Sequence, residues 1–328
     1  MTKLLSISDI HQGTIVSPPS GIRVVSQSKL VANLIDRNPD AILIAGDLQD
    51  YMWNDGTTPE SISLVKKNIL DDSVLELLNK AKTPVYFVFG NTDIMDCEKE
   101  TESSPLTDEL RDWFTAEFTN FHNCHMQKFE IDNKYTITGY QDANETDQYS
   151  SGKVWDETQI HKEFRPFVEN LTNEEKKNLI ILTHTPPRGI LDFSSLGSRH
   201  IGSFYLRELI DDFQPKLSMF GHVHYLGGYS MFCGRTQCLN VSSFGLAVSY
   251  DILFGQSAFE VDLEPETEDI ETTMIVPHFW EGKRRYPFLE YRKCQGCERF
   301  APFARRQFKY CRICLGTRRM QNQSSNQT

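Results

Sequence analysis

Two histidines stand one residue apart in residues 219–228, which read MFGHVHYLGG. In an extended chain, residues i and i+2 project from the same face, so the rings of His222 and His224 would point into one region. The ordinary interpretation of an isolated His-x-His is a pair of surface or hydrogen-bonded side chains. Histidine is also the commonest metal ligand in proteins. The pair is therefore a candidate metal site that other residues must complete.

Other side chains that can bind metal ions follow short apolar runs elsewhere in the chain. In chain order, the complete set of candidate metal ligands is Asp9, His11, Asp47, Asn91, His184, His222 and His224. Carboxylates, an amide oxygen and imidazoles provide the mixed oxygen and nitrogen ligands that suit transition metals. Two ions about 3.5–4 Å apart need a bridging carboxylate. Asp47 is the candidate bridge, because the glycine before it lets the backbone approach closely.

The segments that precede these ligands predict the elements that position them. Four apolar runs are typical of buried strands, at residues 3–8, 41–45, 84–89 and 178–183. Helical patterns lie between them, for example at residues 28–37, 61–80 and 202–212. Alternating strands and helices predict an α/β fold, in which ligands gather at the carboxyl ends of the strands. Short β-type segments separated by Gly and Ser predict antiparallel pairs within residues 229–262.

The order and spacing of five motifs resemble the calcineurin-like metallophosphoesterase superfamily over about residues 1–262. The motifs are Asp9-Ile-His11, Gly46-Asp47, Gly90-Asn91, His184 and Gly221-His222-Val-His224. The resemblance implies a four-layer α/β/β/α sandwich. It implies that Asp9, His11 and His224 bind a first ion. It likewise assigns Asn91, His184 and His222 to a second ion, with Asp47 as the bridge.

The same resemblance implies a mechanism and its cofactors. Two divalent transition metals, drawn from Mn, Fe and Zn, would hold a hydroxide that attacks the phosphoryl group. The candidate catalytic residues are Asp47, Asn91 and His184. Sequence features near Thr185-Pro-Pro187 and His200-Ile-Gly-Ser further resemble the branch of small-substrate phosphodiesterases.

One position departs from the superfamily pattern. Many members have a histidine directly after the asparagine, but here Thr92 follows Asn91. This leaves the general acid unassigned, which matters least when the leaving group is already a good one. His122, His125 and His200 are candidate substitutes, and for each of them a structural role is the ordinary alternative.

Two Cys-x-x-C pairs separated by thirteen residues lie near the end of the sequence. The four cysteines, Cys294, Cys297, Cys311 and Cys314, have the spacing of a closed tetrahedral zinc site. In so short a segment, one structural Zn would supply much of the folding free energy. The pattern resembles a zinc ribbon over residues 290–317.

The segment around these cysteines is basic. Residues 283–328 hold twelve Lys or Arg and two Glu, although the whole chain has a net charge of −11. Aromatic residues alternate with the candidate nucleic-acid contacts Arg299, Arg305, Arg306 and Lys309. Such a pattern suits phosphate contacts and base stacking. The alternative is a small domain that uses its aromatics as a core and docks on the acidic main domain or on a protein partner.

Composition limits the remaining possibilities. Hydrophobic content of 39% and charged content of 24% suit a soluble globular protein. We expect no membrane span, no signal peptide and a cytoplasmic location, because no apolar run approaches 18 residues and Asp9 interrupts the N-terminal run. We predict a phosphoesterase domain at 1–265, an acidic-to-basic linker at 266–289, the ribbon at 290–317 and a disordered tail at 318–328.

The sequence therefore predicts a dinuclear metal-dependent phosphoesterase. The expected substrates are nucleotide or nucleic-acid phosphodiesters. The alternative is a non-catalytic scaffold that uses the phosphoesterase fold and the zinc ribbon to bind proteins. The complete ligand set favours the enzyme, since a scaffold has no use for it.

Overall fold

The computed structural model describes most of the 328-residue chain. The described residues are 1–10, 27–49, 52–53, 59–96, 105–144, 154–194, 199–242, 244–248, 251–255, 258–264, 270–275, 290–297, 299–303, 309–311 and 314. His11, Arg305, Arg306 and the predicted tail lie outside these residues.

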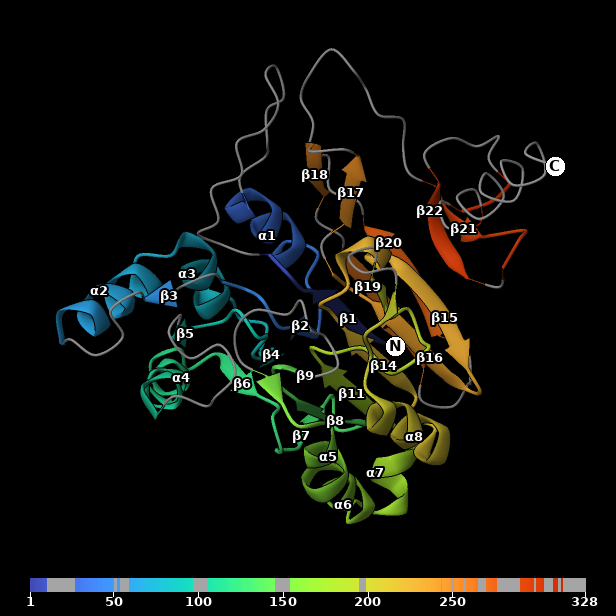
Figure 1. Cartoon of the computed structure of the whole chain (residues 1–328), viewed down its shortest axis with the longest axis horizontal. Coiled ribbons are helices and arrows are strands. Elements are labelled where there is room, and N and C mark those ends of the chain that lie inside the picture. The colour runs from blue at the N-terminus through green and yellow to red at the C-terminus, as the bar shows by residue number, and fades with distance from the viewer. Residues whose placement is uncertain are drawn as a thin grey trace.

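A six-stranded sheet is formed mainly by the first part of the chain (Figure 1). Its strands are β1 (Thr2–Ile7), β2 (Ala41–Ala45), β4 (Val85–Val88), β6 (Phe121–Asn123), β19 (Ala258–Leu263) and β20 (Ile270–Ile275). The order across the sheet is β20-β19-β1-β2-β4-β6. The four strands from β1 to β6 run parallel, and β19 and β20 pair antiparallel. Three of the four predicted strands are β1, β2 and β4.

A second sheet contains eight strands in the order β21-β22-β15-β16-β14-β11-β8-β7. These are β7 (Phe129–Ile131), β8 (Tyr135–Tyr140), β11 (Leu179–Thr183), β14 (Leu217–Phe220), β15 (Tyr229–Cys233), β16 (Thr236–Asn240), β21 (Glu290–Lys293) and β22 (Phe300–Phe303). The fourth predicted strand is β11, at the middle of a parallel group with β8 and β14. β15 and β16 form the antiparallel pair expected after residue 229.

The apolar residues of the two sheets explain how the layers stack. Successive side chains of a strand point to opposite faces, and the sheets face each other across a shared core that includes Leu4, Leu43, Ile180 and Met219. Leu5 belongs to a different core, formed with the helices on the outer face of the first sheet. These helices are α1 (Gln27–Ile35), α2 (Pro59–Leu70), α3 (Ser73–Lys80) and α4 (Pro105–Glu117).

Helices also cover the outer face of the second sheet (Figure 1). They are α5 (Glu157–Gln159), the π-helix η1 (Ile160–Phe164), α6 (Arg165–Glu169), α7 (Asn173–Lys177) and α8 (Phe204–Phe213). Ile181 of β11 packs there with Phe164 and Leu209. The result is the α/β/β/α sandwich that the sequence resemblance implied.

The predicted helix at residues 61–80 is two helices. The carboxylate of Asp72 accepts hydrogen bonds from the backbone N–H groups of Val74 (2.8 Å) and Leu75 (3.1 Å). An aspartate in this position begins a new helix, because it satisfies N–H groups that have no partner in the first turn. The first helix therefore ends at Leu70 and the second begins at Ser73, although the helical pattern of apolar residues runs across both.

The range 266–289, predicted as a linker, contains a strand of the first sheet. β20 pairs with β19 from Ala258↔Ile275 to Leu263↔Ile270, and Ile270 packs against the core between the sheets. The acidic residues between the two strands indicated a solvated connection. The strand was not predicted because the Ile, Thr and Met residues that follow were assigned to the same connection. The other predicted domain boundaries stay predictions.

Short ladders and one helical turn complete the described fold. They are β3 (Met52–Trp53), β5 (Met95–Asp96), β9 (Ala143–Asn144), β10 (Val154–Trp155), β12 (Phe193–Ser194), β13 (Arg199–His200), β17 (Phe244–Val248), β18 (Asp251–Gly255) and the 3-10 turn η2 (His224–Leu226). Among the described residues, no helix is long and apolar enough to cross a membrane.

Candidate active site

Five parallel strands end where the candidate ligands begin. Asp9 follows β1, Asp47 follows β2, Asn91 follows β4, His184 follows β11, and His222 follows β14. Asp9, Asp47 and His222 have positive φ angles of 52°, 48° and 68°. This left-handed conformation is uncommon for residues other than glycine, although aspartate and histidine adopt it more readily than most side chains.

Glycines allow these strand ends to approach one another. A Cβ atom on Gly46 would lie 2.5 Å from Nδ1 of His184 and 2.7 Å from the Cα atom of Gly90. A Cβ on Gly90 would overlap the Asp47 carboxylate, and one on Gly221 would lie 2.5 Å from Oδ2 of Asp9. The motif glycines are therefore needed because no side chain fits between the ligands.

One group of ligand atoms converges around Nε2 of His184. This nitrogen lies 2.9 Å from Oδ1 of Asn91, 3.3 Å from Oδ2 of Asp47 and 3.1 Å from Nδ1 of His222. Ligand atoms of Asp47, His184 and His222 all lie within 4.8 Å of one another. His184, Asp47 and Asn91 are buried, and His222 is partly buried. The structure thus brings together four of the predicted ligands.

The hydrogen-bond chemistry of this group fits a metal cation. Nδ1 of His184 lies 2.8 Å from the carbonyl oxygen of Ala45, and a carbonyl only accepts, so Nδ1 carries a hydrogen atom. In a neutral ring, Nε2 then offers a lone pair towards the oxygens of Asn91 and Asp47, which offer lone pairs as well. A cation at the point of convergence would satisfy all of them, and a second hydrogen bond on the far ring nitrogen is typical of metal-binding histidines.

A proton is the alternative cation in a metal-free protein. Burial alone would lower the pKa of His184, but the carboxylates of Asp47 and Asp9 and the hydrogen bond to Ala45 raise it to about 9. A metal ion that binds here must therefore displace a proton.

Asp9 and His224 form a second pair of predicted ligands. Oδ1 of Asp9 lies 3.0 Å from Nε2 of His224. Ser8 donates its hydroxyl hydrogen to Oδ2 of Asp9 (2.5 Å), and the N–H of His222 lies 3.0 Å from Oδ1. Although burial raises the pKa of Asp9, the neighbouring His224 and His184 lower it to about 2. The third predicted ligand of this ion, His11, is outside the described residues.

A buried network behind Asn91 was not predicted from the sequence. Arg111 donates from Nη1 to Oδ1 of Asp142 (2.6 Å) and from Nη2 to the carbonyl oxygens of Gly90 (3.1 Å) and Asp93 (2.7 Å). Asp93 in turn accepts hydrogen bonds from the N–H groups of Gly90 and Gln49, each at 2.8 Å. These contacts fix the loop that carries Asn91.

Burial and the nearby Asp47 carboxylate raise the pKa of Asp93 to about 7. The sequence contained one signal for this network. Arg111 lies on the apolar face of α4, beside Leu110 and Phe114. A buried arginine is rare unless a carboxylate pairs with it, as Asp142 does here.

The three histidines considered as general acids occupy different environments. The ring of His122 lies 5.3 Å from that of Tyr86 and 5.5 Å from that of Phe129, and burial lowers its pKa. The ring of His125 lies 4.7 Å from that of Tyr140. These two have packing roles, whereas Nδ1 of His200 lies 2.6 Å from a carboxylate oxygen of Asp192.

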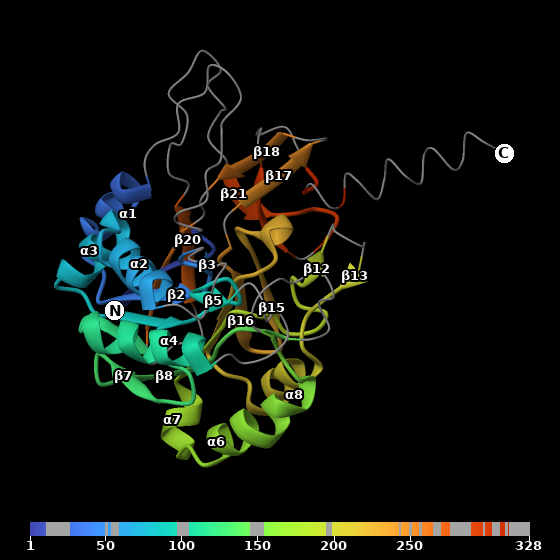
Figure 2. The same cartoon turned by 60° about the vertical axis from the view of Figure 1, so that its left-hand side comes forward.

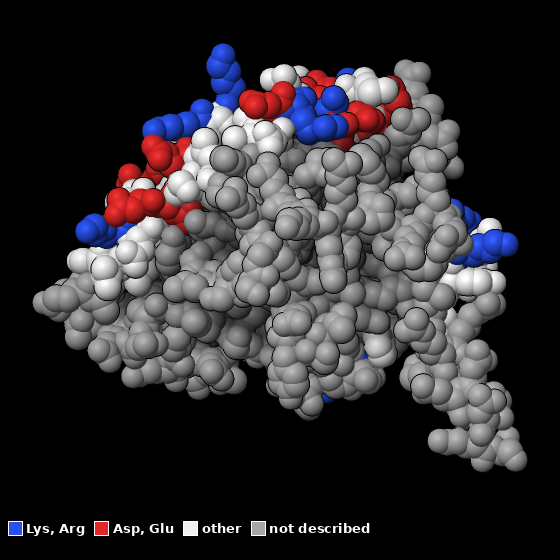
Figure 3. All heavy atoms as spheres, turned by 90° about the horizontal axis from the view of Figure 1, so that it is seen from above, with Lys and Arg blue, Asp and Glu red and all other residues white. Residues whose placement is uncertain are grey.

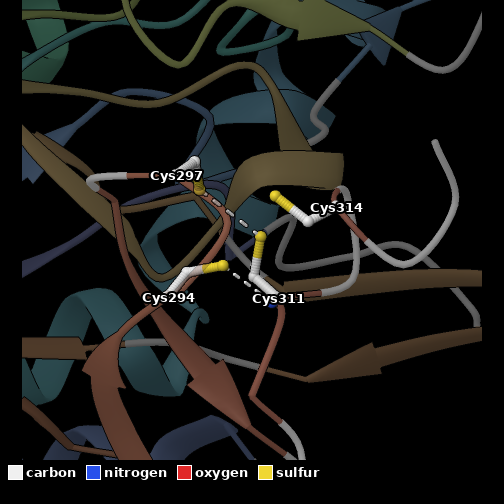
Figure 4. A group of neighbouring side chains, drawn as sticks. All are labelled: Cys294, Cys297, Cys311 and Cys314. Atoms are coloured by element: carbon white, nitrogen blue, oxygen red, sulfur yellow. Dashed lines mark hydrogen bonds between the residues drawn. The ribbon is translucent and has the colours of Figure 1, made fainter. Parts of the chain in front are cut away.

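The four C-terminal cysteines cluster as their spacing predicted (Figure 4). Their sulfur atoms all lie within 4.8 Å of one another, with 3.8 Å between Cys297 and Cys311. The N–H groups of Gly296 (3.3 Å) and Cys311 (3.0 Å) donate to Sγ of Cys294. Burial raises the pKa of Cys294, but these hydrogen bonds outweigh burial and lower it to about 7. A thiolate with such partners is a good metal ligand.

The cysteine cluster docks on the second sheet. β22 pairs with β15 at Ser230↔Phe300, and Cys294 and Cys311 share an apolar core with Val223 and Leu226. Val223 lies between the two predicted ligands His222 and His224. The cysteine cluster therefore supports the loop that carries these two histidines. This agrees with the alternative in which the C-terminal segment docks on the main domain.

Two of the four predicted nucleic-acid contacts are described. Lys309 is exposed and Arg299 is partly buried. On the face shown in Figure 3, acidic and basic side chains are interspersed in the part that the structure describes. The described part of this face therefore has no large patch of one charge.

Comparisons with known proteins identify the family and agree with the fold. The sequence profile of the calcineurin-like phosphoesterase family matches residues 2–226, which is more than half of the chain. The protein belongs to this family and is a hydrolase of phosphate esters. Family membership favours the enzyme over the non-catalytic scaffold. No curated protein sequence gave a match.

Two solved structures support the same fold at low sequence identity. One crystal structure, covered over 98% of its chain and 83% of this chain, has a TM-score of 0.56 at 16% identity. The purple acid phosphatase PPD1 from yellow lupin (Lupinus luteus) has a TM-score of 0.52 at 11% identity, covering 86% of this chain and 52% of that chain. A third structure, TT1561 of Thermus thermophilus, has a lower TM-score of 0.47 at 14% identity, covering 83% of this chain and 98% of that chain.

Proposed function

We propose that the protein is a dinuclear metal-dependent phosphodiesterase that acts on nucleotide or nucleic-acid substrates. The observation that carries this proposal is the convergence of Asp47, His184 and His222 at the ends of three strands. These ligand atoms lie beside the Asp9–His224 pair. The hydrogen bond from the N–H of His222 to Asp9 joins the two groups. Two adjoining ligand groups of this chemistry suit a pair of transition-metal ions.

The residues divide between two ions. Asp9, His11 and His224 would hold the first ion, and Asn91, His184 and His222 the second, with Asp47 shared. Manganese, iron and zinc are the candidate metals. When bound, the two ions would activate water for attack and neutralise charge on the phosphoryl oxygens.

The chain's own contribution is to keep these ligands in place. Ser8 and the N–H of His222 hold the Asp9 carboxylate from two sides, and the N–H of Thr92 donates to Oδ1 of Asp47 at 3.0 Å. Ala45 fixes the tautomer of His184. Such groups orient ligands before binding, so less ordering is needed when the ions and the substrate arrive.

The four cysteines are proposed to bind one structural zinc ion. With Zn–S bonds of about 2.3 Å, the sulfurs of a tetrahedral site are about 3.8 Å apart. The Cys297–Cys311 distance of 3.8 Å matches this spacing. Four sulfur ligands leave no open position, so this site would have no role in the hydrolysis itself.

Hydrolysis of bis-p-nitrophenyl phosphate with added manganese tests the enzymatic proposal. We expect turnover by the wild-type protein and a loss on the order of 10³-fold for Asp47→Asn and His222→Ala. Asp212→Asn is the matched control, since this aspartate is half-exposed and pairs with Arg165 on the surface. No turnover with manganese, iron, zinc or cobalt would refute the proposal. A screen of cyclic nucleotides, oligonucleotides and phosphomonoesters then defines the substrate.

The basic C-terminal segment is proposed to contact nucleic acid through Arg299, Arg305, Arg306 and Lys309. Each phosphate contact releases counterions, so its removal lowers the salt dependence of binding by about 0.7 in the slope for a single strand. We expect Lys309→Ala to weaken oligonucleotide binding and to flatten this slope. Equal affinity and an equal slope for wild type and variant would leave docking within the protein as the role of the segment.

A further inference from the structure

The position after Asn91 cannot supply a proton to the leaving group. Thr92 donates its backbone N–H to Asp47, and its hydroxyl lies 3.4 Å from the carbonyl oxygen of Gln49. A threonine hydroxyl is too weak an acid to protonate an alkoxide at neutral pH. A phosphodiesterase with alcohol leaving groups needs another donor, and general acids increase such rates by about 10²–10⁴.

Asp192 and His200 form a dyad with the properties of such a donor. Nδ1 of His200 lies 2.6 Å from Oδ1 of Asp192, and the other carboxylate oxygen accepts the N–H of Gly202 at 3.1 Å. The Asp192 side chain is 1% exposed, whereas the His200 side chain is 49% exposed. The buried carboxylate thus fixes the ring, and Nε2 is turned away from it. A histidine oriented by a carboxylate is a recurrent arrangement for proton transfer.

Packing places this dyad beside the loop of the metal ligands. Phe193, which neighbours Asp192, pairs with His200 across the β12–β13 hairpin and packs against the core that contains Val223 and Leu226. β12 lies against η2, which begins at His224. Figure 2 shows β12 and β13 at the right of the view, above α8.

Two hydrogen-bonding residues tie the hairpin to the site. The side-chain amide of Asn240 donates to the carbonyl oxygens of Leu191 (3.3 Å) and Val223 (3.1 Å). Arg188 follows His184 by four residues and donates from Nη1 to the carbonyl oxygen of His200 at 2.6 Å. The dyad is therefore held from both sides by segments that carry metal ligands.

We propose that His200, oriented by Asp192, donates the proton to the leaving-group oxygen. This inference rests on the phosphodiesterase function proposed above. The bond between phosphorus and the leaving oxygen breaks as the oxygen of water bonds to phosphorus. The proton on Nε2 of His200 moves to the leaving oxygen, and the ring takes a proton from the attacking water or the solvent. Asp192 is a positioning residue, because it acts through the ring.

Phosphodiesters that differ only in the leaving phenol test this role. His200→Ala should lose about 10²-fold or more in kcat with a phenyl ester. It should lose less than about fivefold with a p-nitrophenyl ester, because p-nitrophenolate leaves without a proton. Asp192→Asn should show the same dependence on the leaving group with a smaller loss. His161→Ala is the matched control, since this exposed histidine also has an aromatic neighbour, Tyr205, at 5.0 Å.

The outcomes separate this inference from the proposed function. Bound metal should be unchanged in His200→Ala, and added imidazole should restore part of its activity with the phenyl ester. An equal loss with both esters, or no loss with either, would overturn the role of His200. Retention of activity by Asp47→Asn would instead overturn the proposed function itself.

Discussion

Two groups of side chains in this protein are suited to bind metals. They are the predicted ligands at the strand ends, here called the strand-end site, and the cysteine cluster, and they are assembled differently. The strand-end ligands come from segments between Asp9 and His224, and five strands of the two sheets position them. The four cysteines come from residues 294–314, whose described parts are the strand β22 and short segments beside it. The first site is therefore held by the fold, whereas the second would depend on its proposed zinc ion to hold the segment together.

Removal of the strand-end metals gives the largest expected effect on activity. Treatment with a chelator should reduce diester hydrolysis to background, while the far-ultraviolet circular dichroism of the main domain stays unchanged. Manganese should then restore activity without refolding, because Ser8, Ala45 and Thr92 hold the ligands in place. Loss of helical signal on chelation would show that the strand-end site also depends on its ions for structure.

Replacement of Arg111 tests whether the fold holds the strand-end site. Arg111→Met removes the cation from the buried carboxylate of Asp142, which should destabilise the protein by about 3–5 kcal/mol. It should also weaken metal binding by about 10–100-fold, since the loop of Asn91 loses its support. Both effects can be measured by urea unfolding and manganese titration. Arg165→Met is the control, because surface ion pairs contribute about 1 kcal/mol or less.

Replacement of a cysteine ligand tests the second half of the comparison. Cys311→Ser should remove one zinc ion per chain and destabilise the protein by about 3 kcal/mol or more. Diester hydrolysis should fall by less than about tenfold, because the strand-end ligands keep most of their supports. Cys124→Ser is the control, since Cys124 is buried between the sheets, away from the cluster. Unchanged zinc content in Cys311→Ser would contradict the proposed ligand set.

Metal binding at the strand-end site should also depend on pH. The pKa of His184 in the metal-free fold is about 9, compared with 6.5 for an ordinary histidine. Its proton therefore stabilises the metal-free fold fully below pH 6.5, and this contribution is lost as the pH rises through 9. Between these values, apparent manganese affinity should rise about tenfold per pH unit. A flat profile in isothermal titration would contradict the raised pKa.

The features predicted well from sequence are those with a local signal. The strands before Asp47, Asn91 and His184 are apolar runs that end at glycine or polar residues, and the cysteine spacing is complete in itself. The strand-end ligands could be predicted to lie close together, because the carboxyl ends of parallel strands lie at the same edge of a sheet.

The features missed depend on contacts between distant segments. Arg111 is 31 residues from Asp142, and Ser230 of β15 is 70 residues from its partner Phe300. Neither pairing leaves a pattern within its own segment. β20 was missed for another reason. The acidic residues before it indicated a solvated segment, whereas its pairing with β19 places Ile270 against the core.

The docking of β22 also has a consequence for aggregation. Without β21 and β22, the outermost strand on that side of the second sheet would be β15, and it would carry Phe232, which is 51% exposed even with the hairpin in place. A long apolar edge strand recruits strands of other molecules. In the intact chain the outermost strand is β21, which reads EYRK, and charged side chains at an edge oppose such pairing. The C-terminal hairpin therefore covers the edge of β15 at Ser230 and gives this side of the sheet a charged outermost strand.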